Sequence, residues 1–213
     1  MKVLVLPVLW LVLFSTAAPG GAEAEADRLA ALLELRPGVS VAEIGAGGGE
    51  LTLEIAERVG ATGRVYATEI EVEKQAAIRA AAREAGLANV EVLAAQLTSS
   101  GLPAGCCDAV FMRHVYHHLS DPAAVDRDLL RALRPGGVLV VVDFPPTWYL
   151  RPFTPEGVGE ERSRHGIEAS DALIELLAAG FGQARRIEPW HERWLGPDTY
   201  ALVVRRPDTK AAP

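Results

Sequence analysis

The sequence predicts an α/β fold, in which a mostly parallel sheet carries helices on both of its faces. Short apolar segments alternate with helical segments five times, and glycine or proline marks the turns between them. Strands that are joined through helices lie parallel, because the connecting helix has to pack back onto the sheet. At 213 residues the chain is long enough for one core, so we expect a single domain.

The predicted elements follow one another in a regular order. A helix over residues 25–35 ends at Arg36-Pro37-Gly38, since proline cannot continue a helix and glycine turns freely. A similar stop, Arg134-Pro135-Gly136-Gly137, precedes a strongly apolar strand. Further helices are expected over residues 51–59, 71–85, 122–133 and 169–179, and strands over residues 39–44, 64–68, 90–94, 108–112, 138–143, 184–188 and 199–205. The last two strands lie close enough in the chain to pair antiparallel.

The first 24 residues are interpreted as a signal peptide. A single lysine precedes an unbroken apolar stretch over residues 3–14, and two overlapping Ala-x-Ala patterns at positions 22–26 suit signal cleavage. We therefore expect an exported protein, periplasmic or secreted, whereas an uncleaved segment would anchor it in a membrane. The folded domain is expected over residues 25–206, followed by a flexible tail over residues 207–213.

Charge and cysteine usage narrow the possible partners. The chain carries 28 acidic and 21 basic residues, a net charge of -7, which repels nucleic acid phosphates. A nucleic acid partner is therefore not expected. The two cysteines, Cys106 and Cys107, are adjacent, and neighbours in sequence almost never have the geometry to bridge. We interpret them as small apolar residues that lead into a buried strand.

A glycine-rich turn follows the first predicted strand and precedes a helix. Glycines in Gly45-Ala46-Gly47-Gly48-Gly49 let the backbone bend and a ligand approach, and free N–H groups at a helix start favour negative charge. This arrangement indicates a nucleotide site. The dinucleotide fingerprint G-x-G-x-x-G is not met, because Glu50 stands where its third glycine should be. That departure counts against NAD and FAD.

These residues resemble the motifs of class I S-adenosylmethionine (SAM)-dependent methyltransferases. The resemblance covers residues 29–143: an acid, Glu43, two residues before the first glycine; Glu69 at the end of the second strand; the fourth strand; and Leu133-Arg-Pro-Gly-Gly. It implies a Rossmann-like, seven-stranded, mostly parallel sheet with helices on both faces and a C-terminal antiparallel hairpin. It also implies SAM as cofactor and S-adenosylhomocysteine as product. A Tyr-His-His sequence resembles small uncharacterised members of the family.

The resemblance assigns cofactor-binding roles residue by residue. Glu69 would accept from both ribose hydroxyls, a charge-assisted bidentate contact, and Glu43 would face the methionine portion. The family's usual adenine-binding Asp is missing here. Gln96 is expected to accept in its place while the Leu97 backbone N–H donates, with Thr98 as a substitute. The expected cofactor-binding set is Glu43, Gly45, Ala46, Gly47, Gly49, Glu69, Ile70, Gln96, Leu97 and Arg113.

Candidate catalytic residues follow the fourth strand, in the segment Arg113 to His118. The carboxyl end of the sheet is where open α/β folds bind ligands, so Tyr116 and His117 are expected to be catalytic, and Arg113 and Tyr116 to line the pockets. If the acceptor must lose a proton, His117, His118 or His165 could serve as base. No metal is expected, because no Cys, Asp or Glu lies at ligand spacing beside these histidines. Residues 144–166 are expected to cover the acceptor.

The leading functional hypothesis is a methyltransferase that acts on a small-molecule or lipid-like acceptor. One alternative is a catalytically silent SAM- or S-adenosylhomocysteine-binding protein, suggested by the missing adenine Asp and by export. A second alternative is a nicotinamide-dependent oxidoreductase with a Rossmann fold. Glu50 and the turn Arg134-Pro-Gly-Gly argue against that second alternative.

Overall fold

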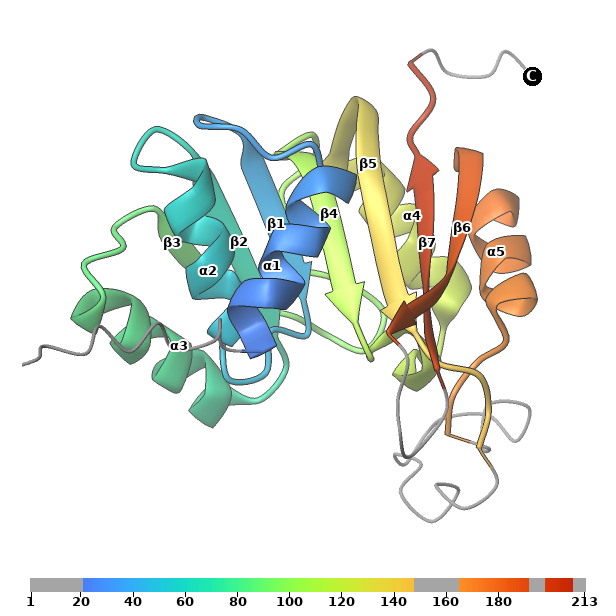
Figure 1. The fold of residues 1–213 in the computed structure, drawn as a ribbon, viewed down its shortest axis with the longest axis horizontal. Coiled ribbons are helices and arrows are strands. Elements are labelled where there is room, and N and C mark those ends of the chain that lie inside the picture. The colour runs from blue at the N-terminus through green and yellow to red at the C-terminus, as the bar shows by residue number, and fades with distance from the viewer. Residues whose placement is uncertain (1–20, 148–164, 192–197, 209–213) are drawn as a thin grey trace, which may run out of the picture.

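The computed structural model describes residues 21–147, 165–191 and 198–208, which form a seven-stranded sheet between two layers of helices (Figure 1). The strand order is β3-β2-β1-β4-β5-β7-β6. Strands β1 to β5 pair in parallel, and β7 pairs antiparallel with both β5 and β6. The predicted fold class is therefore confirmed. The strands are β1 (Ser40–Ile44), β2 (Arg64–Glu69), β3 (Val90–Ala94), β4 (Cys107–Arg113), β5 (Leu133–Asp143), β6 (Gly182–His191) and β7 (Thr199–Arg205).

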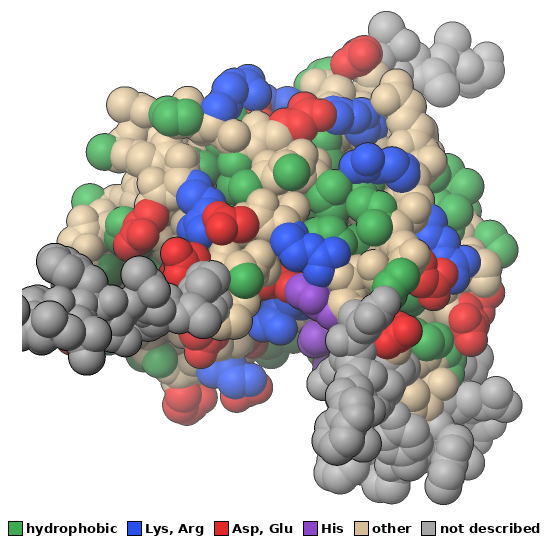
Figure 2. Space-filling model, viewed as in Figure 1, with side chains coloured by type: hydrophobic (Ala, Val, Ile, Leu, Met, Phe, Trp, Pro, Cys, Tyr) green, Lys and Arg blue, Asp and Glu red, His purple; other side chains and the backbone are tan. Residues whose placement is uncertain are grey.

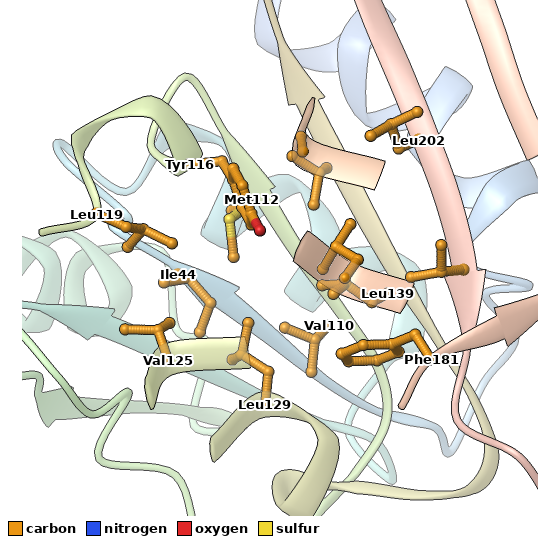
Figure 3. Packing of buried hydrophobic residues seen from close by; sticks show 14 of the residues in the cluster. Ile44, Val110, Met112, Tyr116, Leu119, Val125, Leu129, Leu139, Phe181 and Leu202 are labelled. Atoms are coloured by element: carbon orange, nitrogen blue, oxygen red, sulfur yellow. The ribbon is translucent and has the colours of Figure 1, made fainter. Parts of the chain in front are cut away.

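Two hydrophobic clusters hold the helices against the sheet. The helices are α1 (Gly21–Leu32), α2 (Glu50–Val59), α3 (Val72–Glu84), α4 (Pro122–Ala132) and α5 (Ala169–Ala178), with a short 3-10 helix η1 (Tyr116–His118). Helices α1 and α2 pack on one face of the sheet, and α4 and α5 on the other. Alternate residues of β4 divide between these faces: Phe111 joins the first cluster, and Val110 and Met112 the second (Figure 3).

Strands β5 and β6 are longer than predicted, whereas β7 has the predicted bounds. Strand β5 begins at Leu133, the last residue of the predicted helix, and runs through the predicted stop, because Leu133 pairs with Cys107 across a register shift before regular pairing resumes. Gly136, with a φ of 75°, supplies the irregular conformation. Strand β6 continues to His191, since β7 keeps pairing with it as far as Thr199.

The expectation about the two cysteines is wrong. Cys106 and Cys107 form a disulfide between neighbouring residues, at the start of β4. The part of the expectation that concerned packing agrees with the structure, since the Cys107 side chain is fully buried. Sequence reasoning failed because it judged the bridge from average cysteine geometry.

The N-terminal helix is fixed to the far edge of the sheet. Helix α1 begins at Gly21, and the buried Glu25 accepts a hydrogen bond from Trp190 Nε1 at 2.9 Å and pairs with His191. Residues 1–20 and 209–213, which hold most of the predicted signal peptide and tail, lie outside the described residues. In the described part of the chain, no helix is both long and apolar enough to cross a membrane.

Candidate active site

The glycine turn joins β1 to α2 with three left-handed glycines. Gly45, Gly47 and Gly49 have φ values of 66°, 57° and 87°, which side-chain-bearing residues adopt only at a cost. Gly45 is also crowded: a Cβ there would lie 2.7 Å from Val115 Cγ2. Gly47 is open, because a Cβ there would meet no described atom within 4 Å. The turn therefore packs tightly at its base and leaves room for a ligand at Gly47.

Glu69 stands at the end of β2, where backbone N–H groups surround its carboxylate. One oxygen, Oε2, accepts from Gly47 N at 2.9 Å, and the other, Oε1, accepts from Ile70 N at 2.7 Å and Glu71 N at 3.3 Å. The side chain is 8% exposed. A carboxylate held by three N–H groups keeps its orientation. Oε2 has one donor and retains a lone pair for a ligand, whereas Oε1 holds its second donor, Glu71 N, only at the longer distance of 3.3 Å. This arrangement suits a ligand with two adjacent hydroxyls.

Glu43 lies beneath the turn and is buried. Its Oε2 accepts from Thr52 Oγ1 at 2.5 Å. Burial raises the pKa of Glu43 to about 8, although the hydrogen bond from Thr52 and the charge of Arg113 both act to lower it. At neutral pH the group is therefore mainly a neutral acid. A cation placed beside it would favour its ionised form.

A cavity of about 390 Å³ opens at the carboxyl ends of β1, β2 and β4, within the range of small-ligand pockets. It runs from Glu69 and the glycine turn to His118 in η1. Its walls are formed by Ile44, Gly45, Gly47, Glu69, Ile70, Glu71, Lys74, Ala95, Gln96, Leu97, Ser99, Ser100, Val115, His118, Leu119, Ser120 and Val125.

Six of the predicted cofactor residues lie in the wall of this cavity: Gly45, Gly47, Glu69, Ile70, Gln96 and Leu97. Four do not. Ala46 packs with Ala67 and Ile78, and Gly49 is buried against Ile78. Glu43 lies below the turn, and Arg113 is exposed at the end of β4, where its charge acts on Glu43.

The segment after β3, which replaces the usual adenine-binding acid, forms a tight loop. Gln96 N donates to Ser99 O at 2.8 Å, and Ser99 N donates back to Gln96 O at 3.2 Å. Ser100 fixes this loop to α4, because its N and Oγ both donate to Asp128 Oδ2. Leu97 is left 64% exposed at the cavity mouth. The loop therefore presents an apolar side chain and an amide to the ligand.

A second hollow, of about 650 Å³, lies at the opposite end of the sheet. It is lined by residues that precede β2 and β3, such as Gly63 and Asn89. Asn89 Nδ2 already donates to the carbonyls of Ala56 and Gly60 there. Because open α/β sheets bind ligands at the carboxyl ends of their strands, we assign the site to the cavity beside Glu69.

The histidine-bearing segment lies beside this cavity, where β4 and β5 end. His117 is 2% exposed; its Nδ1 lies 2.8 Å from Asp143 Oδ1, and its backbone N donates to Asp143 Oδ2 at 3.1 Å. The fully buried Asp143 also accepts from Phe144 N at 2.9 Å. The last residue of β5 therefore fixes the orientation of the His117 ring.

Two further histidines face His117. The ring centroids of His118 and His165 lie 4.0 Å and 4.8 Å from that of His117. Burial, reinforced by the neighbouring rings, lowers the pKa of His118 to about 4. It also holds the pKa of His165 below its usual value. Both rings are therefore neutral at pH 7 and offer lone pairs at this end of the cavity.

Tyr116 does not lie where its predicted catalytic role requires. Its side chain is fully buried beside Met112 (Figure 3), and its hydroxyl donates to Asp126 Oδ2 at 2.7 Å. Burial and the Asp126 charge raise the pKa of the phenol. The turn of η1 aims this ring into the core, so the geometry gives no support to contact between Tyr116 and a substrate.

Several wall residues were missed by sequence reasoning. Ser99 and Ser100 were hidden in a polar loop with no periodicity, although their place after a strand end was a usable signal. Val115 was passed over as an apolar residue among histidines, yet it contacts the glycine turn. His165 was considered only as a base. Residues 148–164, which form most of the expected acceptor cover, lie outside the described residues.

Sheet order, glycine turn and strand-end acid together define a class of protein. A glycine turn after β1 and a ribose-binding acid after β2, under a sheet that ends in an antiparallel hairpin, form the SAM site of class I methyltransferases. The residues present fit this cofactor, because Gly47 leaves the space and Glu69 Oε2 has a lone pair free for a ribose hydroxyl of SAM.

Comparisons with known proteins give the same class. Residues 42–141 match the model of a methyltransferase domain. The chain is 32% identical to nocamycin O-methyltransferase of Saccharothrix syringae over 202 residues, which cover 84% of this chain and 71% of that relative. The chain belongs to the class I SAM-dependent methyltransferase family, and SAM is its cofactor.

Two further comparisons mark what is shared and what differs. The chain is also similar to the ubiquinone/menaquinone biosynthesis C-methyltransferase UbiE of Shewanella woodyi. The two are 30% identical over 110 residues, and this match covers 51% of this chain and 44% of that relative. The crystal structure of a SAM-dependent methyltransferase from Aquifex aeolicus superimposes with a TM-score of 0.67 and 22% identity, over 85% of this chain and 89% of that one. The fold is shared with the Aquifex aeolicus structure, and the two named relatives are an O-methyltransferase and a C-methyltransferase.

Proposed function

We propose that this protein transfers a methyl group from SAM to a small-molecule or lipid-like acceptor that binds at the His118 end of the cavity. The observation that carries this proposal is continuity: one cavity reaches from Glu69 and Gly47, which suit the cofactor, to the histidine cluster. Bound SAM supplies a methyl group that is already activated on a sulfonium centre. The chain then has to position the acceptor and exclude water.

A small acceptor agrees with the charge of the molecule. The net charge is -7, and on the face that carries α1 and α2 acidic and basic side chains are interspersed rather than gathered by sign (Figure 2). Nucleic acid substrates favour a basic stripe. The names of two relatives refer to nocamycin and to ubiquinone/menaquinone biosynthesis, respectively. These observations support a small organic acceptor.

The acceptor end of the cavity suits a group that loses or shares a proton. His118 lines this end and is neutral at pH 7, because burial lowers its pKa to about 4. Its ring therefore brings a lone pair rather than a second positive charge close to a cationic cofactor. We place the acceptor here rather than at Tyr116, whose hydroxyl is committed to Asp126.

Calorimetric titration with SAM and release of S-adenosylhomocysteine over a panel of acceptors test this proposal. Glu69→Ala removes two charge-assisted contacts to the ribose, so SAM binding should weaken by about 100-fold or more. Glu91→Ala is the matched control, because the Glu91 side chain is half-buried, lies outside the cavity wall and pairs only with Arg64 among the interactions described. Equal SAM affinity in wild type and Glu69→Ala would contradict the assigned site.

Turnover separates an enzyme from a silent binder. His118→Gln should lower turnover of a responsive acceptor and leave SAM affinity unchanged, since His118 lies at the other end of the cavity from Glu69. SAM binding without turnover on any acceptor would favour the silent SAM-binding alternative. The comparisons do not favour that alternative or the nicotinamide-dependent one.

We also propose that the protein is exported and that its signal is cut after Ala24. Cleavage at the other Ala-x-Ala pattern, after Ala26, would remove the Glu25 carboxylate from Trp190 and take the fully buried Ala26 out of the core. Residues 21–24 are mostly exposed, so their loss removes less, namely the partly buried Ala22 and the contact between Arg58 and the Glu23 carbonyl. The mass of the protein recovered from the periplasm or medium tests this: a chain that begins at Glu25 is expected, and one that keeps residue 1 would contradict export by cleavage.

A further inference from the structure

We propose that His117, His118 and His165 bind one divalent transition-metal ion at the acceptor end of the cavity. This inference goes beyond the proposed methyl transfer and does not depend on it, because it is argued from the arrangement of the three histidines. The three residues each offer a ring nitrogen, and these nitrogens all lie within 4.8 Å of one another. Four of the five histidines of the chain gather at this end of the sheet, since His114 also packs against Phe144 beside His117.

The three nitrogens are buried without hydrogen-bond partners in the described part of the chain. They are His117 Nε2, His118 Nε2 and His165 Nδ1. A buried polar atom that makes no hydrogen bond costs about 1–3 kcal/mol, so native proteins rarely leave one unpaired. Three such atoms, on residues whose ligand nitrogens lie within 4.8 Å of one another, indicate a shared partner. One cation would satisfy all of them together.

Asp143 prepares His117 for this role. Its carboxylate accepts from His117 Nδ1 at 2.8 Å, which places the proton on Nδ1 and leaves the Nε2 lone pair free. A histidine that ligates a metal commonly donates its other ring N–H to a carboxylate, which fixes the ring and strengthens the ligand. Among the contacts described, the buried Asp143 has no Lys or Arg partner, and its partners are the His117 ring and the backbone N–H groups of His117 and Phe144.

The backbone holds His165 in place beside the other two. His165 has a φ of 49°, a left-handed conformation that few residues adopt without support. Support comes from the end of β5: Ile167 N donates to Phe144 O at 3.0 Å, and Thr147 contacts the His165 carbonyl. These hydrogen bonds form a short backbone ladder between residues 144–147 and residues 165–167. The strained backbone serves to bring the third imidazole to the cluster.

Three imidazoles and no acid among the proposed ligands favour a transition metal over calcium or magnesium. Imidazole suits zinc, copper, nickel and iron, and three protein ligands with one open position are typical of catalytic zinc sites. Zinc–nitrogen distances of about 2.0–2.1 Å require the rings to close inward by roughly 1 Å. Because His118 lines the cavity, the open position would face the acceptor.

Metal binding is tested on the untagged full chain with Zn²⁺ and Co²⁺. We expect one Zn²⁺ per chain in competition with a chromophoric chelator, and Co²⁺ absorption bands characteristic of nitrogen ligands. His118→Gln and His165→Gln should each weaken Zn²⁺ binding by about tenfold or more. His191→Gln is the matched control, because His191 lies at the Glu25 contact and away from the cluster. Its Zn²⁺ affinity should equal that of the wild type.

Two results would overturn the proposal: no Zn²⁺ bound to the wild type, or unchanged affinity and stoichiometry in the double variant His118→Gln/His165→Gln. The Co²⁺ spectrum of the wild type decides independently of whether any variant folds. SAM titration of the same samples keeps the two proposals apart. Loss of metal binding with intact SAM binding removes only this inference, whereas absent SAM binding with bound metal removes only the proposed methyl transfer.

Discussion

The two ends of the cavity differ in how their polar groups are satisfied. At the cofactor end, Glu69 is held by three backbone N–H groups and Glu43 by Thr52. At the histidine end, His117 is anchored on one side only, and the facing nitrogens of His118 and His165 have no described partner. One end is complete before a ligand arrives, while the other presents lone pairs that a ligand has to satisfy.

This difference teaches where each kind of specificity resides. A preorganised carboxylate binds a constant cofactor, because its geometry needs no adjustment on binding. Unpaired buried nitrogens gain most from a bound partner, so under the proposed function we expect the histidine end to select what binds beside the cofactor. The two ends touch through Gly45 and Val115, which pack together at the base of the cavity.

The largest effect on stability should follow from overcrowding the contact between Gly45 and Val115. In Gly45→Ala the new Cβ would lie 2.7 Å from Val115 Cγ2, at a φ of 66°. Left-handed strain of about 1–2 kcal/mol adds to overpacking of about 1–3 kcal/mol, so the free energy of unfolding should fall by about 2–5 kcal/mol. Gly47→Ala is the control, because the strain is similar and the space is open. Urea unfolding measures both, and equal losses would contradict a packed contact at Gly45.

Next in size is the loss of the carboxylate behind His117. Asp143→Asn has one acceptor oxygen fewer for the N–H groups of His117 and Phe144, so Zn²⁺ affinity should fall by about 10–100-fold. The matched control is Asp128→Asn, which likewise disturbs an acceptor of backbone and hydroxyl donors at Ser100 but lies away from the histidines. Chelator competition measures both variants. A drop of the same size in Asp128→Asn would mean that Asp143 acts through general stability alone.

The sequence was enough to predict that the glycine turn and Glu69 lie together, but not how the histidines are arranged, because the first depends on local motifs and the second does not. The glycine turn with Gly45 and Gly47 directly follows β1, and Glu69 is the last residue of β2. The order of strands and helices was therefore enough to predict that these residues lie together. His165 reaches the cluster only through the backbone ladder at Phe144, which no local pattern encodes. The direction of Tyr116 depends on a single turn of 3-10 helix, and helical or strand periodicity says nothing about it.

A smaller, pH-dependent effect should distinguish Glu43 from Glu69. Burial raises the pKa of Glu43 from 4.5 to about 8, so its neutral form is favoured in the folded state. The sign follows: its contribution to stability is fully present below pH 4.5 and is lost as the pH rises through about 8. A nearby cationic cofactor favours the ionised form. SAM affinity should therefore rise with pH toward about 8, by at most tenfold per pH unit, and then level off.

Glu43→Gln supplies the control for both trends. The amide keeps an acceptor for Thr52 Oγ1 and cannot ionise. The contribution of this position to the pH dependence of stability and of SAM affinity should therefore vanish. Unfolding free energies and SAM titrations between pH 5 and 9 measure the difference between wild type and variant, with the range set by the shifted pKa of Glu43. Parallel curves for the two proteins would show that the cation of the cofactor does not reach Glu43.

The smallest effect concerns the mouth of the cofactor end, where Leu97 is 64% exposed in place of the usual adenine-binding acid. If the adenine ring covers this side chain, Leu97→Ala removes roughly 1 kcal/mol of apolar burial and weakens SAM binding about fivefold. Ile174→Ala on α5 is the control, since Ile174 is 65% exposed and lies outside the cavity wall. Thermal midpoints should stay unchanged in both variants. Unchanged SAM affinity in Leu97→Ala would contradict contact between the adenine ring and the Leu97 side chain, and would leave Gln96 as the expected adenine-binding residue.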